Sequence, residues 1–193
     1  MAYEVKDFSS LLGTTGFSDD LLNTHFKLYQ GYVANTNKLV DKLTAMSGDD
    51  IQSPEYAELK RRFGWEFNGM RLHEYYFANM SKEVSILQED GALHKQIVQD
   101  FGSYDQWLAD FKGTGSLRGI GWSILSYDPI GKRLFNTWIN EHDLGHLAGA
   151  QPILVMDVFE HAFVLDYGMQ RAQYIDAFVA AINWQEAERR FTA

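Results

Sequence analysis

Two long stretches of helical periodicity in the first half of the chain limit its possible folds most strongly. Apolar side chains recur every three or four positions over residues 18–45 and again over residues 54–80. Ser18 can cap the first helix, and Pro54 can open the second after the turn at Ser47-Gly-Asp-Asp. Two long helices joined by a short turn predict an antiparallel helical hairpin.

The second half of the chain mixes short helical patterns with β-type patterns. Three short apolar runs with β-branched and aromatic residues predict antiparallel strands. They cover residues 122–127, 134–139 and 153–156, and short helical patterns cover residues 93–101, 104–111 and 171–191, the last broken near Asn183. The predicted fold class is therefore α+β. We expect an N-terminal helical hairpin domain (residues 1–82) and a C-terminal α/β domain (residues 83–193) with a three-stranded antiparallel sheet and helices.

Composition excludes several classes of function. Seventeen Lys and Arg residues against 26 Asp and Glu residues give a net charge of -9, which argues against nucleic acid and anionic membranes as partners. The sequence contains no cysteine, so any metal must be bound by histidines and carboxylates. No basic leader followed by an apolar run is visible, and we expect a cytoplasmic protein.

The strongest local signal for chemistry is the pair Asp157 and His161. Asp157 directly follows the apolar run 153–156, and His161 comes four residues later. These two side chains can converge on one cation if the chain turns into a helix between them. The same spacing is also typical of a helix cap followed by a surface histidine.

Two histidines on the predicted hairpin are candidate partners for this pair. His73 lies beside Leu72 on the inner stripe of the second helix, and His25 lies on the inner stripe of the first helix. A buried histidine tends to be neutral, and it is then either a hydrogen-bonded core group or a metal ligand. With Asp157 and His161 the set contains three imidazoles and one carboxylate, which suits iron, manganese or zinc with an open position.

Several segments, in order along nearly the whole chain, resemble the iron/manganese superoxide dismutase family. Asp157-Val-Phe-Glu-His161-Ala is similar to the family signature D-x-[WF]-E-H-A, and Asn68-Gly-Met-Arg-Leu-His73-Glu-Tyr-Tyr76 is similar to its second-helix histidine segment. The other matching segments are Phe101-Gly-Ser103, Gly119-Ile-Gly-Trp122 and Asn183-Trp184. The resemblance implies conversion of superoxide to dioxygen and hydrogen peroxide at one Fe or Mn ion per subunit. It also implies that His73, Asp157 and His161 are metal ligands.

The fourth ligand and the gateway tyrosine follow from the first-helix segment. The resemblance makes Tyr32 the gateway tyrosine, and the family's first-helix ligand usually lies eight residues before it, at Thr24 in this sequence. His25 lies seven residues before Tyr32. At about 100° per residue, seven residues return a side chain to within roughly 20° of the same helix face, whereas eight leave it about 80° away. Since threonine is also a poor ligand for a redox metal, His25 is the predicted fourth ligand.

The family's outer-sphere hydrogen-bonding residue is usually a glutamine from one of two positions. Gly69 stands at the second-helix position and His142 at the other, and a histidine there resembles a known subgroup of the family. We therefore predict that His142 and Tyr32 relay protons. The alternative for His142 is a surface position in a variable loop.

The resemblance also implies a homodimer. Glu160-His161 is similar to the family's bridge, in which each glutamate binds the ligand histidine of the opposite subunit.

Three alternatives to an active superoxide dismutase stay open. One is a family member that binds metal but has little dismutase activity, motivated by the shifted first ligand and by apolar Leu28 and Val164 at two usually polar positions. The others are a non-catalytic helical interaction domain and an oxygenase with two histidines and one carboxylate as iron ligands. The choice between iron and manganese stays open.

Overall fold

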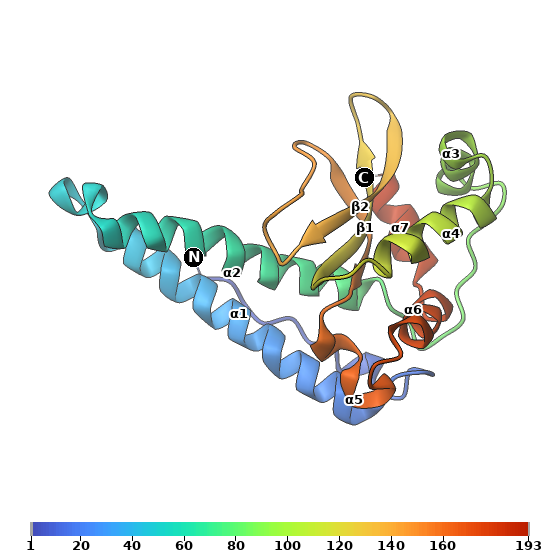
Figure 1. Cartoon of the computed structure of the whole chain (residues 1–193), viewed down its shortest axis with the longest axis horizontal. Coiled ribbons are helices and arrows are strands. Elements are labelled where there is room, and N and C mark those ends of the chain that lie inside the picture. The colour runs from blue at the N-terminus through green and yellow to red at the C-terminus, as the bar shows by residue number, and fades with distance from the viewer. Residues whose placement is uncertain (1, 193) are drawn as a thin grey trace.

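The computed structural model describes residues 2–192 and shows a long helical hairpin that leads into a small sheet surrounded by helices (Figure 1). The helices are α1 (Asp19–Ala45), α2 (Pro54–Ala78), α3 (Ala92–Phe101), α4 (Tyr104–Gly115), α5 (Val164–Tyr167), α6 (Arg171–Ala180) and α7 (Trp184–Phe191). The strands are β1 (Gly121–Asp128), β2 (Arg133–Asn140) and β3 (Gln151–Asp157). The predicted α+β class with a helical hairpin and a three-stranded antiparallel sheet is confirmed.

Both hairpin helices begin where the sequence predicts a helix start. The Ser18 hydroxyl accepts a hydrogen bond from the Leu21 backbone N–H at 3.0 Å, and the Ser53 hydroxyl accepts one from Tyr56 at 3.1 Å. Pro54 occupies the first position of α2, where a missing N–H costs nothing. The two helices are joined by a short 3₁₀ helix, Gly48–Gln52, so α1 and α2 lie antiparallel along their length (Figure 1).

The sheet has the order β2-β1-β3, with β1 in the centre and antiparallel to both neighbours. Its register places Trp122, the second residue of β1, opposite Asp157, the last residue of β3. The sheet therefore delivers the Asp157 carboxylate to the edge that faces the hairpin.

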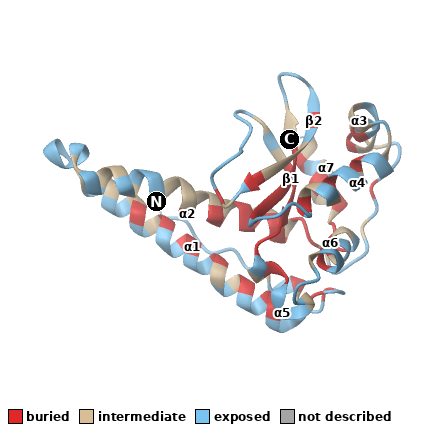
Figure 2. Cartoon of the chain, in the orientation of Figure 1, coloured by how far each residue is buried: buried red, intermediate tan, exposed pale blue. Residues whose placement is uncertain are grey.

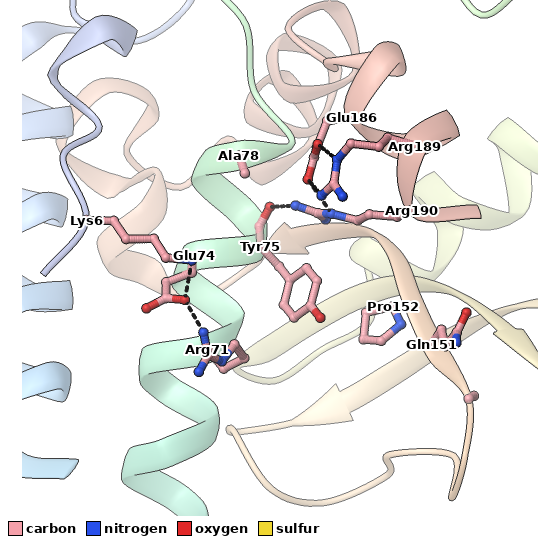
Figure 3. Close-up of a pocket in the computed structure, with 11 residues that line it drawn as sticks. Lys6, Arg71, Glu74, Tyr75, Ala78, Gln151, Pro152, Glu186, Arg189 and Arg190 are labelled. Carbon is pink, nitrogen blue, oxygen red and sulfur yellow. Dashed lines mark hydrogen bonds and ion pairs between the residues drawn. The ribbon is translucent and has the colours of Figure 1, made fainter. Parts of the chain in front are cut away.

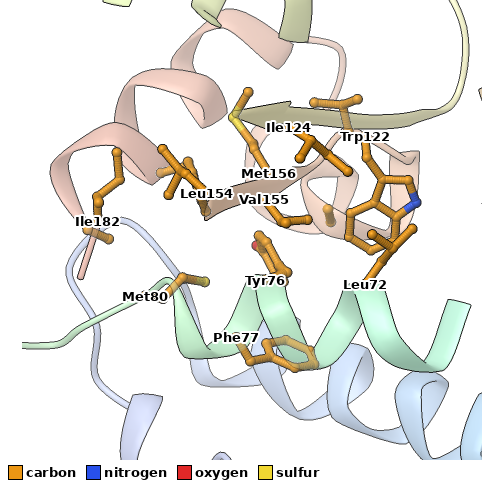
Figure 4. Packing of buried hydrophobic residues seen from close by; sticks show 14 of the residues in the cluster. Leu72, Tyr76, Phe77, Met80, Trp122, Ile124, Leu154, Val155, Met156 and Ile182 are labelled. Atoms are coloured by element: carbon orange, nitrogen blue, oxygen red, sulfur yellow. The ribbon is translucent and has the colours of Figure 1, made fainter. Parts of the chain in front are cut away.

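The main core lies between α2 and the sheet. Figure 4 shows Leu72 and Tyr76 of α2, and Met80 just after the helix, facing apolar side chains of β1 and β3, whereas Phe77 lies on the opposite side of α2. The sheet side of this contact includes Trp122, Ile124, Leu154, Val155 and Met156, all at most 1% exposed. Each such side chain contributes about 1.5–3 kcal/mol by burial, so this contact holds α2 in a fixed position against the sheet.

A buried arginine ties the hairpin to the sheet and to α7. Arg190 donates through Nε to Glu186 at 2.9 Å and through one terminal nitrogen to the Tyr75 carbonyl at 3.3 Å (Figure 3). Its other terminal nitrogen donates to Asn79 Oδ1 at 2.7 Å. Asn79 Oδ1 also accepts from the backbone N–H of Val155 at 3.0 Å. These bonds join the end of α2 to β3 and α7.

The far end of the hairpin contacts little of the rest of the chain. Residues 47–52 are all exposed, and Figure 2 shows this end of the hairpin in pale blue, beyond the buried faces. Buried faces begin along α1 and α2 closer to the sheet (Figure 2). Among residues 2–192, no helix is both long enough and apolar enough to cross a membrane.

Candidate metal centre

The structure brings the four predicted ligand side chains together between the hairpin and the sheet. His25 comes from α1, His73 from α2, Asp157 from the end of β3, and His161 from the short 3₁₀ helix Glu160–Ala162. One ligand atom of each residue lies within 4.8 Å of the other three. The histidine chosen by helix geometry, His25, is thus part of the cluster, and Thr24 is exposed on α1.

The spacing of these atoms fits a single metal ion. Nε2 of His161, His25 and His73 lies 3.1, 3.3 and 3.6 Å, respectively, from Asp157 Oδ2. Two donors bound at about 2.1 Å to one ion stand roughly 3–3.5 Å apart. Nε2 of His25 and Nε2 of His73 are buried without a hydrogen-bond partner, and each such atom costs about 1–3 kcal/mol. A metal ion would satisfy both of these nitrogens.

Neighbouring groups aim the ligand atoms into the cluster. Asp157 Oδ1 accepts the backbone N–H of Phe159 at 2.8 Å, which leaves Oδ2 to face the imidazoles. The Tyr174 hydroxyl donates to the Asp157 carbonyl at 2.5 Å. His73 Nδ1 donates to the Gly69 carbonyl at 2.5 Å, so its Nε2 is the atom free to bind a metal.

Burial sets the protonation state of the cluster. It lowers the pKa of His25 and of His73, so both imidazoles are neutral at pH 7 and can donate a lone pair. Burial alone would raise the pKa of Asp157, but its electrostatic interactions with His161 and His25 hold it below its ordinary value. The donor set therefore carries one negative charge on the carboxylate, which suits a cation of charge two or three.

Aromatic rings enclose the cluster. Ring centroids of Tyr76 and His25 are 5.2 Å apart, those of Trp122 and His73 are 5.1 Å apart, and those of Phe159 and His161 are 5.1 Å apart. His161 has 26% of its side chain exposed, whereas His25, His73 and Asp157 are at most 1% exposed. Of the four side chains, His161 is therefore the one that contacts solvent in the single chain.

His142 is buried against the cluster, so the alternative of a surface histidine is wrong. Its Nδ1 accepts from Trp122 Nε1 at 3.1 Å, and its Nε2 lies 2.8 Å from the Tyr32 hydroxyl oxygen. Because an indole N–H can only donate, Nδ1 must be unprotonated and the neutral ring carries its hydrogen on Nε2. His142 thus donates to Tyr32 Oη, and the Tyr32 hydroxyl hydrogen is free to point elsewhere.

Two further residues around His142 were not predicted from the sequence. His146 Nε2 lies 2.9 Å from the His142 carbonyl oxygen and donates to it, and the four-residue spacing of these histidines was the available signal. Trp65 of α2 packs its ring against His142, with centroids 4.5 Å apart. Trp65 and His142 are far apart in the sequence, so no local pattern indicates this contact.

The fold and the site together define an α+β protein in which three histidines and one carboxylate form a buried cluster that could hold one metal ion, between a helical hairpin and a three-stranded sheet. Residues 89–190 match the family described as iron/manganese superoxide dismutases, C-terminal domain. The chain belongs to the iron/manganese superoxide dismutase family.

Relatives of this chain carry names for both metals. An iron superoxide dismutase of Cupriavidus metallidurans is 38% identical over 200 residues, covering 100% of this chain and 98% of the relative. A manganese superoxide dismutase of Haloferax volcanii is 34% identical, covering 90% and 86%, respectively. An iron superoxide dismutase of Aquifex pyrophilus is 33% identical, covering 97% and 90%. Similarity extends over the hairpin as well as the sheet.

Proposed function

We propose that His25, His73, Asp157 and His161 bind one iron or manganese ion and that the chain converts superoxide to dioxygen and hydrogen peroxide at this site. The observation that carries the proposal is the buried four-residue cluster with two imidazole nitrogens lacking partners, in a chain of this family. When bound, the metal supplies a reversible one-electron couple: one superoxide is oxidised to dioxygen, and a second is reduced and leaves with two protons as hydrogen peroxide.

The test is metal analysis of the protein as isolated, together with a dismutase assay. We expect about one equivalent of iron or manganese per chain and activity that follows metal content. Metal-loaded protein without turnover would favour the alternative of a family member with little dismutase activity. Protein that binds no transition metal in equilibrium dialysis would overturn the proposal. Because relatives are named for either metal, the same analysis decides between them.

Tyr32 and His142 are the proposed proton-delivery residues. Burial lowers the pKa of His142 to about 4, so its ring stays neutral above about pH 5 and keeps donating through Nε2 to Tyr32 Oη. Burial also raises the pKa of Tyr32, so its hydroxyl keeps its proton. Tyr32 can then offer that hydrogen to an anion in the site, while His142 fixes the position of the hydroxyl oxygen.

Replacement of His142 by alanine is expected to leave the metal bound, because His142 is outside the four-residue cluster. Turnover should fall roughly 10–100-fold as Tyr32 loses its partner, and the reduction potential should shift. Metal content and dismutase rate measured on the same sample check this. Full occupancy with unchanged rate and potential would remove His142 from the mechanism.

Gly69 is expected to tolerate no side chain. A Cβ at this position would lie 2.5 Å from Cδ1 and 2.6 Å from Cε1 of Tyr32, so Gly69→Ala must displace the Tyr32 ring from its present position, in which it bonds His142. We expect retained metal with turnover about tenfold lower. A crystal structure of the variant and its rate check the effect. Gly64→Ala, with open space around the Cβ, is the matched control on the same helix. Equal rates for both variants would contradict the expectation.

A homodimer formed near the metal centres is the proposed assembly. Glu160 is exposed beside the cluster, and three exposed apolar side chains lie nearby: Val164 at 41%, Leu165 at 60% and Met169 at 91%. Such a patch next to a charged residue is typical of an association surface. In the proposed dimer, Leu28 and Val164 make an apolar contact at the two positions where the family usually has a polar contact.

A cytoplasmic location stays a prediction.

Glu160→Ala is expected to weaken the dimer and to reduce metal retention, because each glutamate would bind a ligand histidine of the opposite subunit. Sedimentation velocity over a micromolar concentration series, with metal content measured on the same samples, checks both effects. Glu58→Ala on the exposed face of α2 is the control. A wild-type protein that is monomeric at micromolar concentration would refute the assembly.

A further inference from the structure

The residue before His142 has an unusual backbone conformation. Glu141 has φ of 50°, and among residues 2–192 only Lys132 is another non-glycine residue with positive φ. This left-handed region is unfavourable for a residue with a Cβ, so surrounding contacts must hold it. Residues 143–149 of the same loop are exposed, whereas His142 is completely buried. The turn at Glu141 therefore directs one loop side chain inward.

Trp65 of the hairpin contacts both Glu141 and His142. Its Nε1–H donates to Glu141 Oε2 at 3.0 Å, and its ring meets the His142 ring edge-on with centroids 4.5 Å apart. The Glu141 backbone N–H donates to the Ile120 carbonyl at 3.0 Å, which fixes the other side of the turn. Trp65 thus holds the side chain of one loop residue and the ring of the next.

Trp65 is itself held in place on α2. The Arg62 guanidinium lies over its ring at 4.0 Å, and Arg62 is paired with the buried carboxylate of Glu66 at 2.6 Å. The Trp65 ring also packs against Tyr32, with centroids 5.6 Å apart. The same indole therefore touches Tyr32 and His142, the two groups joined by the 2.8 Å hydrogen bond.

We infer that Trp65 and Glu141 are positioning residues that act through His142: their hydrogen bond, made between the hairpin and the loop, sets where His142 Nε2–H stands relative to Tyr32 Oη. The inference rests on the proposed function, because it takes His142 as the partner that orients Tyr32. If the Trp65–Glu141 bond is lost, the loop can relax and the His142 ring moves relative to Tyr32. Metal binding does not depend on this bond, because the four clustered ligands lie elsewhere.

The first experiment is a double-mutant cycle of Trp65→Phe and His142→Ala in the metal-loaded protein. Trp65→Phe keeps an aromatic ring and removes the donor, and we expect full metal content with turnover and azide affinity each about five- to tenfold lower. In the His142→Ala background, the same substitution should cause no further loss, because two residues that act through one interaction are not additive. Trp107→Phe is the matched control, since it removes an indole bond to Asn136 Oδ1 at a distant position.

The proposed roles of His142 and Trp65 predict different outcomes. If His142→Ala alone has no effect, the proposed role of His142 is wrong. If His142→Ala has its effect but Trp65→Phe has none, or has the same effect in both backgrounds, the positioning role of Trp65 is overturned while His142 keeps its role. A loss confined to the background with an intact His142 supports the inference.

Glu141 variants and the metal-free protein give independent measurements. Glu141→Gln keeps an acceptor for Trp65 and should retain most of the turnover, whereas Glu141→Gly removes the acceptor and frees the backbone, and should match Trp65→Phe. In metal-free protein, nuclear magnetic resonance should show faster water exchange of the His142 Nε2–H in Trp65→Phe than in wild type. Equal exchange in the two proteins, or equal losses for Glu141→Gln and Glu141→Gly, would overturn the role of the hydrogen bond.

Discussion

Replacing His73 by alanine is expected to abolish stoichiometric metal binding and to lower the dismutase rate more than about 100-fold. This loss exceeds the one typical of replacing a residue that only hydrogen-bonds a metal ligand. The side chain is fully buried, and its Nδ1 is occupied by the Gly69 carbonyl, so Nε2 has no role other than binding in the cluster. Among the described residues, the group of converging donors includes His73, His25, His161 and Asp157, so the variant keeps three of four donors. Elemental analysis and pulse radiolysis of the same sample measure both quantities.

The control for His73→Ala is His94→Ala. His94 lies on α3, away from the cluster, and its ring packs against Tyr104 with centroids 6.4 Å apart. This variant should bind one equivalent of metal and keep the wild-type rate. A His73→Ala protein that still bound one equivalent with unchanged spectrum and activity would show that the ligand assignment is wrong.

Arg190→Met is expected to lower the free energy of unfolding by about 3 kcal/mol. Methionine keeps much of the apolar stem, but the Tyr75 and Ile153 carbonyls lose a donor and Asn79 Oδ1 keeps only the Val155 N–H. These acceptors are in the contact between α2, β3 and α7, where water does not readily replace the guanidinium. Urea unfolding of metal-free protein, followed by tryptophan fluorescence, measures the change.

Arg189 provides the matched comparison on the same helix. Its side chain is 66% exposed and pairs only with Glu186 among the described residues, at 2.6 Å. An exposed pair of this kind is worth at most about 1 kcal/mol, so Arg189→Met should change the unfolding free energy little. Similar losses for the two variants would mean that the buried bonds of Arg190 do not stabilise the contact between the hairpin and the sheet.

Local signals in the sequence predicted the helices other than the short α5, and most of the candidate site. Ser18 and Pro54 lie where helix starts require them, because these signals depend on neighbouring residues only. His25 was predicted from helix geometry, since seven residues bring a side chain back to nearly the same face as Tyr32. Both residues are buried on α1, as this argument requires.

Features that depend on contacts between distant segments could not be predicted. The alternation pattern of three strands does not say that β1 is the central one, because that order depends on how the strands pair. Arg190 is on a short helix near the end of the chain and resembles a surface residue, yet it is buried by its bonds to Asn79 and Tyr75. The Trp65–Glu141 bond joins residues 76 positions apart.

The exposed end of the hairpin implies a gradient of local opening along α1 and α2. Amide hydrogens near residues 47–52 should exchange with solvent fastest, because little apolar surface must be exposed to open the helices there. His25 lies near the start of α1 and His73 near the end of α2, so both are at the end of the hairpin that is far from residues 47–52. Fraying can therefore begin at the connection without reaching the metal centre, and insertions or a new chain terminus between residues 47 and 52 should leave the site intact.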